Sequence, residues 1–409
     1  MGRISLASHW TRRTQRSGWA EFPGRVLVTL VVCVLMLAGC GPTGPYWEAL
    51  ASSQGDTIVS LAQDPSQTKI LYAGANHGVI YRTRTDGIST PVGGEGLPAS
   101  AQTNALLPDP HAPGVVYAAT TSGLYVTTDD GNHWSQRGTG LPRDDVLTAL
   151  IFGASDSALL AGTFHRGVYT SADQGHTWTH IDSGLPGGAD INTLFHDPAS
   201  QVEFAGLDGG GLYVSVDGGQ TWAQRTGGLA SNAHVYVFAE TPARGTNPGG
   251  PALYIGTAAG LYASANDGTT WTQRGAGQGL PSGSVRALAA DPKTPGVLYA
   301  AIGSVVYGTT DGGAHWTTLA PGLSQPVTSL VVAITPSGKP VIFAGAGQLQ
   351  RFPAIGGTTN ALLGNIIAWG FIILVFGLGF FVIYRTRIKL DATTRNMRRR
   401  LTPLNRPPT

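Results

Sequence analysis

The sequence predicts an all-β fold, a seven-bladed β-propeller, and three observations lead to that prediction. An eight-residue pattern of hydroxyl, Asp, Gly and Trp recurs with its tryptophans 44, 44, 49 and 45 residues apart. A period of ~40–50 residues that carries strands and turns is typical of propeller blades. The 58 glycines and the charged fraction of 12% suit short strands joined by tight turns. A strand-like fragment also precedes the first repeat and can complete the last one. We call the pattern the box; it occurs at residues 127–134 (TTDDGNHW), 171–178 (SADQGHTW), 215–222 (SVDGGQTW), 264–271 (SANDGTTW) and 309–316 (TTDGGAHW).

Each box is expected to be the turn of a β-hairpin. Its hydroxyl and Asp can accept hydrogen bonds from the amides of the turn, its Gly tolerates a positive φ, and its Trp starts the next strand with a buried ring. Three boxes depart from the pattern, because His133 and His315 replace the second Thr and Asn266 replaces the Asp. These are folding roles, so the box predicts the fold and not the function.

The boxes resemble those of the Asp-box (BNR) propellers, whose pattern S-x-D-x-G-x-T-W is met in full by residues 171–178 and 215–222. Families with this repeat include sialidases, other glycoside hydrolases, sorting receptors and photosystem assembly factors. Over residues 46–352 the chain is similar to single, exported, seven-bladed propellers of the photosystem II stability and assembly factor type. That resemblance implies non-catalytic help to a membrane complex, although a C-terminal span is not part of that family's usual plan.

Each repeat has the same predicted order: an apolar innermost strand, a second strand ending in small residues, a Gly-x-Tyr strand, the box and an outer strand. The repeats are expected to begin near Thr57, Thr103, Val146, Ile191, Val235, Val285 and Val327. The third strands are expected at residues 79–82, 124–127, 168–171, 212–215, 261–264 and 305–309.

The seventh repeat ends near Phe352 after only three strands, and residues 46–50 (YWEAL) read as an outer strand without a blade. We therefore expect the N-terminal strand to close the last blade, which removes the exposed edges of an open array. The first repeat has a degenerate box at residues 82–87 and the seventh has none, so six or eight blades remain alternatives at this point.

The N-terminus is expected to direct export. Residues 26–38 form an apolar run that is too short to span a bilayer comfortably and suits a signal peptide. The run ends in Leu37-Ala38-Gly39-Cys40, which looks like a bacterial lipobox with Cys40 as the lipidated residue. The alternatives are an ordinary signal peptide and an uncleaved signal anchor. The expected organisation is a signal peptide at 1–39, a spacer at 40–45 and the propeller at 46–352.

The C-terminus is expected to cross the membrane once. After a linker at residues 353–360, residues 361–384 carry no charge and would be ~36 Å long as a helix. A basic tail follows at 385–409, and the positive-inside rule places it in the cytoplasm and the propeller outside. A buried core helix is the alternative for the apolar stretch.

Composition excludes several partners. The two ends carry +4 (residues 1–39) and +7 (residues 385–409) of a net charge of +2, which leaves the body at −9. An acidic body does not suit nucleic acid, whose phosphates need clustered Lys and Arg. The only cysteines are Cys33 and Cys40, so the body has no disulfide and no thiolate metal site. No cofactor is expected.

We expect binding at one mouth of the central channel. The loops between second and third strands and between blades should gather there, on the face opposite the boxes. Glu95 is expected nearby, and the candidate ligand-binding residues are Asn76, His77, Arg143, Asp144, Asp145, Phe164, His165, Arg166, Asp190 and Asp208. The alternative interpretation of each residue is a solvated loop residue with no partner. Arg137, Arg225 and Arg274 follow boxes and are expected to decorate outer strands.

A carbohydrate-active enzyme, sialidase-like or another glycoside hydrolase, is the alternative function. It needs two carboxylates facing each other across a sugar. Sialidases also carry an Arg-Ile-Pro stretch ahead of the boxes, which this chain lacks, and xyloglucan-hydrolysing relatives use two propellers. The histidines show no metal-ligand spacing on one element, apart from His176 and His180, which flank a box Trp and are expected at the outer edge. We therefore expect no catalytic residue and no metal, and interpret the chain as a membrane-tethered scaffold that binds a protein partner, or a glycan. A sensor that signals through the span is a third reading, but the tail is short for a signalling domain.

Overall fold

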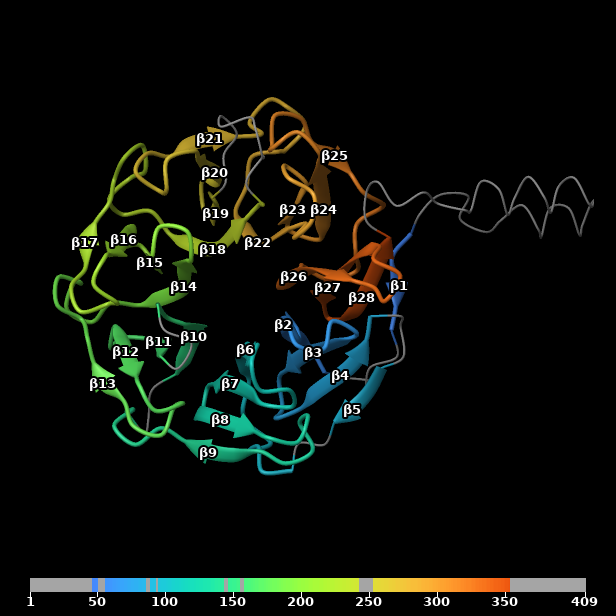
Figure 1. Ribbon diagram of the computed structural model, residues 1–409. Coiled ribbons are helices and arrows are strands. Elements are labelled where there is room, and N and C mark those ends of the chain that lie inside the picture. Colours follow the sequence, from blue (N-terminus) through green and yellow to red (C-terminus); the bar gives the residue numbers. More distant parts are fainter. Residues whose placement is uncertain are drawn as a thin grey trace, which may run out of the picture.

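The computed structural model describes residues 46–50, 56–85, 89–92, 95–142, 146–154, 158–242 and 253–353. These residues form seven antiparallel sheets of four strands each, arranged radially about one axis (Figure 1). The expected all-β propeller with seven blades is therefore confirmed. The described ranges contain no helix, so none in them is long and apolar enough to cross a membrane.

In each of the first six blades, four consecutive strands follow one another from the axis outward. Blades 1 to 3 consist of β2 (Ile58–Gln63), β3 (Ile70–Ala75), β4 (Ile80–Arg84) and β5 (Ser89–Val92); β6 (Thr103–Pro108), β7 (Val116–Thr120), β8 (Gly123–Thr127) and β9 (Ser135–Arg137); and β10 (Leu147–Phe152), β11 (Leu159–Thr163), β12 (Val168–Ser171) and β13 (Thr179–His180). Blades 4 to 6 consist of β14 (Ile191–Asp197), β15 (Val202–Leu207), β16 (Leu212–Ser215) and β17 (Ala223–Gln224); β18 (Val235–Glu240), β19 (Leu253–Thr257), β20 (Gly260–Ser264) and β21 (Thr272–Arg274); and β22 (Val285–Ala290), β23 (Leu298–Ile302), β24 (Val305–Thr309) and β25 (Thr317–Thr318).

Blade 7 joins the two ends of the described chain. It consists of β26 (Ser329–Ile334), β27 (Pro340–Ala346), β28 (Gln348–Pro353) and, as its outermost strand, β1 (Glu48–Ala49). Glu48 is paired with Arg351 and Ala49 with Gln350 in antiparallel register. The expected closure by the N-terminal strand is therefore confirmed.

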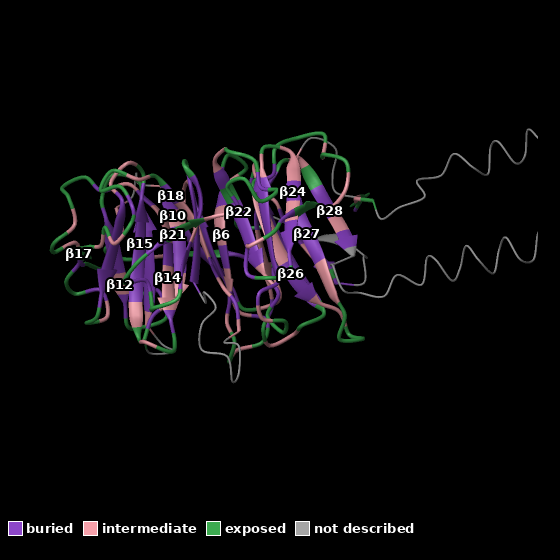
Figure 2. Ribbon diagram, turned by 90° about the horizontal axis from the view of Figure 1, so that it is seen from above, coloured by how far each residue is buried: buried purple, intermediate pink, exposed green. Residues whose placement is uncertain are grey.

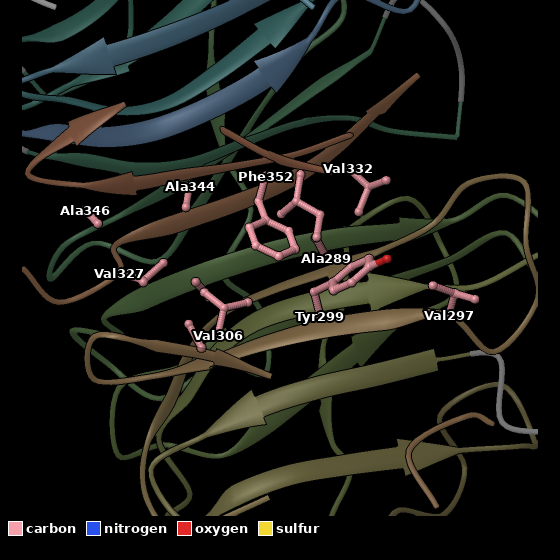
Figure 3. Close-up of a cluster of buried hydrophobic side chains, with 12 residues drawn as sticks. Ala289, Val297, Tyr299, Val306, Val327, Val332, Ala344, Ala346 and Phe352 are labelled. Atoms are coloured by element: carbon pink, nitrogen blue, oxygen red, sulfur yellow. The ribbon is translucent and has the colours of Figure 1, made fainter. Parts of the chain in front are cut away.

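The second strands are buried along their length because the neighbouring blades cover both faces of each sheet. All residues of β3, β7, β11 and β19 are buried. Small residues let the blades approach closely, since a Cβ placed on Gly206 would lie 2.7 Å from Val235 of the next blade. Figure 3 shows one of these interfaces, between blades 6 and 7, where Tyr299 and Phe352 lie among smaller aliphatic side chains.

The boxes fold as expected. In blade 4, Ser215 Oγ accepts from Gly219 N at 2.8 Å, and Asp217 Oδ1 accepts from Thr221 N at 2.9 Å. The box glycine has a φ of 86°, and the ring of Trp222 is buried. The two histidine boxes keep this geometry, because His133 Nδ1 lies 2.6 Å from Asp129 Oδ2.

A repeated connection ties each box to the preceding blade. The backbone N–H of the box Trp donates to a carbonyl that follows the outer strand of the blade before it, as from Trp222 to Ser183 at 2.8 Å and from Trp178 to Thr139 at 2.8 Å. Trp134, Trp271 and Trp316 make the same bond, to Glu95, Gly227 and Gln278. A glycine and a leucine follow each acceptor, at Gly96-Leu97, Gly140-Leu141, Gly184-Leu185, Gly228-Leu229 and Gly279-Leu280. These bonds link successive blades around the rim of the molecule, and we call them the rim staples.

Several expected segments lie outside the described residues. They are the signal peptide at 1–39, Cys40 and its spacer, most of the linker at 353–360, the apolar stretch at 361–384 and the tail at 385–409. Their roles remain predictions.

Candidate functional site

The antiparallel order of the strands separates the loops into two sets on opposite faces. Loops between second and third strands share one face with the connections between blades, and the boxes lie at the other ends of the same strands. Backbone bonds join the first set, from Gly78 to Ala101 at 2.7 Å, from Gly167 to Ala189 at 3.1 Å and from Gly211 to Ala233 at 2.9 Å. We call this the mouth face. The edge-on view shows exposed loops on both faces and buried strands between them (Figure 2).

Three histidine–aspartate pairs hold loops of the mouth face to the adjoining connections. His165 Nδ1 lies 2.7 Å from Asp190 Oδ1, and His234 Nδ1 lies 2.6 Å from Asp208 Oδ1. His77 Nδ1 lies 3.6 Å from Asp56 Oδ1. His165 and His77 have φ values of 79° and 61°, which non-glycine residues adopt rarely. The loops are thus fixed by side-chain contacts in conformations that a free loop would not favour.

The inner strands present one residue each at their mouth-face end. In six blades the register between the first and second strands shifts at the second residue of the innermost strand, which is the signature of a β-bulge. Bulges re-aim a side chain and are frequent next to functional sites. The bulged residues are Val59, Asn104, Thr148, Asn192, Tyr236 and Arg286. Asn104 and Thr148 donate to the backbone of the next blade, at Leu147 O and Ile191 O.

The last three bulged residues, Asn192, Tyr236 and Arg286, lie together with the pair of Asp208 and His234. We call these five residues the mouth cluster. The guanidinium carbon of Arg286 lies 4.2 Å from the ring centroid of Tyr236, and its Nη2 donates to the Tyr236 hydroxyl at 3.4 Å. The His234 ring stacks against the Tyr236 ring, and the two ring centroids lie 6.3 Å apart. Asn192 Nδ2 donates to Asp208 Oδ1 at 3.4 Å. Blades 4, 5 and 6 therefore contribute to one continuous polar and aromatic surface.

Asp208 is held in its charged form. The hydrogen bond from His234 lowers the pKa of the Asp208 carboxyl, and the bond from Asn192 and the positive charge of Arg286 act in the same direction against the effect of partial burial. A carboxyl group of this kind accepts hydrogen bonds and attracts cations. It is poorly suited to act as a general acid, which needs a raised pKa.

The loop between β11 and β12 of blade 3 adds an exposed aromatic ring to the mouth face. Phe164 is 42% exposed, and its ring centroid lies 3.9 Å from that of His165. The carbonyl of Arg166 accepts a hydrogen bond from His180 Nε2 at 2.7 Å, which ties the loop to the outer strand. Aromatic and Arg side chains on a fixed loop suit recognition of a partner.

The structure groups the expected site residues only in part. Phe164, His165, Arg166 and Asp190 come together on blade 3, and Asp208 lies in the mouth cluster of the next blade. Asn76 and His77 lie on the mouth face of blade 1, with blade 2 between them and blade 3; Asn76 Oδ1 accepts from Thr57 N at 2.8 Å. Arg143, Asp144 and Asp145 lie outside the described residues. Glu95 sits at the rim, 3.6 Å from His133 Nε2 of the neighbouring box, and not at the mouth.

Sequence reasoning missed Asn192, His234, Tyr236 and Arg286. A signal was present, because Asn192, Tyr236 and Arg286 are each the second residue of a predicted inner strand and His234 directly precedes one. Among the described residues, no group of three or more His, Cys, Asp or Glu side chains is placed to hold a metal ion.

The comparison with known proteins is informative at the level of structure. No protein-family model matches the chain, and no curated protein matches it. The likeness to solved structures shows the fold. The GH74 xyloglucanase from Xanthomonas campestris superimposes with a TM-score of 0.59 at 19% identity, covering 76% of this chain and 54% of the xyloglucanase. YCF48 from Cyanidioschyzon merolae gives a TM-score of 0.54 at 14% identity, covering 76% of this chain and 99% of YCF48. A structure of YCF48 bound to D1 peptide gives 0.55 at 17% identity, covering 75% and 97%.

The two kinds of neighbour differ in extent. This chain spans about half the length of the xyloglucanase, but almost the whole of YCF48. YCF48 and a xyloglucanase therefore both share the fold of this chain, and the fold does not decide between binding and catalysis.

Proposed function

We propose that the protein is a membrane-tethered, extracytoplasmic propeller that acts as a non-catalytic binding or assembly scaffold for a membrane or envelope complex. The mouth cluster is the observation that carries this proposal. Tyr236 and Arg286 are the residue types that dominate protein interfaces, and both are positioned before a partner arrives. Preorganised side chains lose little entropy on binding, which favours recognition.

The electrostatics of the mouth favour binding over acid–base chemistry. Asp208 has a lowered pKa, and Asp190 Oδ1 accepts a hydrogen bond from the backbone N–H of His165 and lies 2.7 Å from its Nδ1. A carboxyl with a lowered pKa, such as that of Asp208, is poorly suited to donate a proton to a leaving group. The carboxyls with raised pKa values, Glu203 and Glu240, lie on β15 and β18 and are raised by burial.

Tethering rests on the sequence at both ends of the chain. The apolar stretch at 361–384 and its basic tail support a single span with the propeller outside the cytoplasm. Cys40 in its lipobox supports a second, lipid anchor. Protease treatment of intact cells tests the orientation: the propeller should be digested while a C-terminal tag stays protected. Labelling with a radioactive fatty acid should be lost in Cys40→Ser.

A protein partner in the membrane is the expected ligand. YCF48, which has been solved with a D1 peptide, is a precedent for a propeller of this size that binds a protein segment. Affinity capture from detergent-solubilised membranes, with the full-length chain as bait, tests the idea. We expect one membrane protein to be captured reproducibly, and its recovery to fall at least tenfold with the double variant Tyr236→Ala/Arg286→Gln.

The matched control lies on the other face. Val216 is 76% exposed in the box of blade 4, so Val216→Ala changes an exposed side chain away from the mouth. This variant should capture the partner as the parent protein does. Equal capture by the mouth variant would contradict the proposal.

A second candidate, a carbohydrate-active enzyme, is supported by the likeness to the GH74 xyloglucanase. Incubating the purified full chain with xyloglucan and with sialylated glycans, and measuring released sugar, tests it. Hydrolysis that is abolished in Asp190→Asn or Asp208→Asn would favour the enzyme and overturn the scaffold.

A further inference from the structure

A second surface of the molecule carries an open pocket. It has a volume of about 700 Å³ and lies where blade 5 meets blade 6, between the loop after β19 and the connection from β21 to β22. Gln273, Arg274, Leu280, Pro281 and Tyr307 contribute side chains to its lining.

The sequence departs from its repeat at this pocket. In blades 2, 3 and 4, the connection glycine follows the box Trp by six positions, as Gly228 follows Trp222. In blade 5 the interval is eight positions, from Trp271 to Gly279. The loop after β19 is short, with only Ala258 and Ala259 outside the strands. The longer connection from β21 to β22 and the short loop after β19 leave the pocket open between them.

Arg274 differs from the arginines at the same repeat position. Arg137 Nη1 donates to Gln174 O of the next blade's box at 3.3 Å, and Arg225 Nη1 donates to Thr269 Oγ1 at 3.4 Å. The box of blade 6 has Ala314 where blade 5 has Thr269, so the hydroxyl acceptor is missing. The Nε of Arg274 is buried and has no hydrogen-bond partner within the described part of the chain.

A buried donor without a partner is costly, and such groups in native proteins call for an explanation. A ligand in the pocket would supply one if the Arg274 side chain turns its buried Nε toward it on binding. The planar guanidinium matches a carboxylate, to which it can donate two parallel hydrogen bonds. The Gln273 amide is already committed, because its Nε2 donates to Ala259 O at 2.9 Å.

The remaining walls are apolar. Tyr307 is half-buried, Leu280 is 4% exposed, and Pro281 is exposed at the edge. They fit an aliphatic or aromatic group attached to the carboxylate. A smaller pocket of about 210 Å³ shares Ala259 with this one and reaches His234 of the mouth cluster. A segment bound at the mouth can therefore continue into the pocket.

We propose that this pocket binds a carboxylate carried on an apolar body, supplied by an acidic residue beside an apolar one in a peptide segment of the partner. The proposal rests on the proposed binding function and names the chemistry of the segment. Arg274 pairs with the carboxylate, and Tyr307 and Leu280 contact the apolar group.

Calorimetric titration of the full-length chain in detergent tests the proposal. The probes are a capped tetrapeptide Ser-Leu-Glu-Ser, its glutamine counterpart Ser-Leu-Gln-Ser, and 3-phenylpropionate as a free carboxylate. We expect the glutamate peptide to bind at least tenfold more tightly than the glutamine peptide. Arg274→Gln should weaken it at least tenfold, and Ala314→Thr should weaken it several-fold by giving Arg274 an internal acceptor.

Arg225→Gln is the matched control and should leave the affinity unchanged, because that arginine already bonds to Thr269. Tighter binding of 3-phenylpropionate than of the peptide would keep the carboxylate pocket but assign it to a free carboxylate. No binding of either carboxylate, or equal binding by Arg274→Gln, would overturn the proposal. Failure of the scaffold function is distinguishable, because it is measured by partner capture with mouth-cluster variants and not by these probes.

Discussion

Glu48 and Arg351 lie 303 positions apart in the chain and form an ion pair across the seam of blade 7, where Arg351 Nε donates to Glu48 Oε2 at 3.1 Å. Beside this pair, the ring centroids of Trp47 and Phe352 lie 5.1 Å apart. Leu50 N donates to Leu349 O at 2.9 Å and continues the pairing. The short segment of residues 47–50 thus closes the ring by three different kinds of contact, and the contacts differ in how much they stabilise.

The aromatic contact should contribute more to closure than the ion pair. Glu48 is 51% exposed, so Glu48→Gln should lower the free energy of unfolding by at most about 1 kcal/mol, as is usual for surface pairs. Trp47→Ala removes a ring that packs against the blade 6–blade 7 cluster and should cost roughly 2–3 kcal/mol. Urea unfolding midpoints of the two variants measure the difference, and a larger loss for Glu48→Gln would show that this order is wrong.

The staples at the rim depend on glycines that approach a backbone closely. Gly184 has a φ of 91°, and a Cβ there would lie 2.0 Å from the carbonyl oxygen of Trp222. Gly184→Ala must therefore displace the box of blade 4, and we expect a loss of at least about 3 kcal/mol.

Gly218 separates this effect from backbone conformation alone. Its φ is 72°, but no atom lies within 4 Å of a Cβ built there. Gly218→Ala should therefore cost only about 1–2 kcal/mol, the usual penalty for a left-handed conformation. Thermal unfolding of both variants tests the comparison. Equal losses of stability would mean that the clash with the Trp222 carbonyl adds nothing to the destabilisation by Gly184→Ala.

The repeat made the fold predictable because its signals are local. Hydroxyl, Asp, Gly and Trp at fixed spacing define a turn by themselves, and the third strands at Val168–Ser171, Leu212–Ser215 and Val305–Thr309 match their predicted bounds. The closure by residues 46–50 could be inferred because counting strands leaves one blade incomplete. The rim staples were missed, although the recurring Gly-Leu pair after each outer strand is a visible signal.

The candidate site was harder to predict because its members come from different repeats. Asp208 was predicted as an acidic loop residue. Tyr236 and Arg286 lie inside strands, where the sequence pattern predicts only which residues alternate between the two faces of the sheet. Their meeting depends on the distance between two inner strands, which no local pattern encodes. The pairing of His165 with Asp190 has the same origin, since one residue is in a loop and the other precedes the next blade.

The box aspartates should make the protein sensitive to acid. The hydrogen bond from the Thr221 hydroxyl, then those from the Thr221 amide and Ser215, lower the pKa of Asp217. A carboxyl whose pKa is lower in the folded state stabilises the fold above its unfolded pKa of about 3.9, and this stabilisation is lost as the pH falls further. Similar bonds, led by the Thr177 hydroxyl, lower the pKa of Asp173 to about 2. The loss should therefore develop between pH 4 and pH 2.

Blade 5 shows which substitution removes the charge and keeps the turn. Asn266 Oδ1 accepts from Thr270 N at 2.9 Å, the distance that Asp217 has to Thr221 N. Asp217→Asn should thus cost no more than about 1 kcal/mol at pH 7. Its unfolding midpoint should fall less steeply than that of the parent protein between pH 4 and pH 2. An unchanged slope would mean that Asp217 does not contribute to the acid sensitivity.

Glu203 should have the opposite effect on stability, because it is a buried acid in a position that is apolar in other blades. It pairs with the first residue of its box, Ser215, as Leu159 pairs with Ser171 and Leu253 with Ser264. Glu203 is fully buried, and both its carboxylate oxygens lack hydrogen bonds to the described residues. The nearest ionisable partner is His196, whose Nδ1 lies 3.4 Å from Oε1.

Glu203→Leu should therefore stabilise the protein. Burial raises the pKa of Glu203, so the fold is favoured while the group is neutral and loses stability as the pH rises above the unfolded value of about 4.3. At pH 7 the substitution should raise the free energy of unfolding by about 1–3 kcal/mol, because a leucine of similar volume removes the buried charge. The gain should shrink at pH 3, where the acid is almost entirely neutral in both states. Leu159→Glu is the reverse experiment: it places an acid at the same position of blade 3 and should destabilise by at least about 3 kcal/mol at pH 7. A loss of stability in Glu203→Leu at pH 7 would instead mean that the pair with His196 holds blade 4 together.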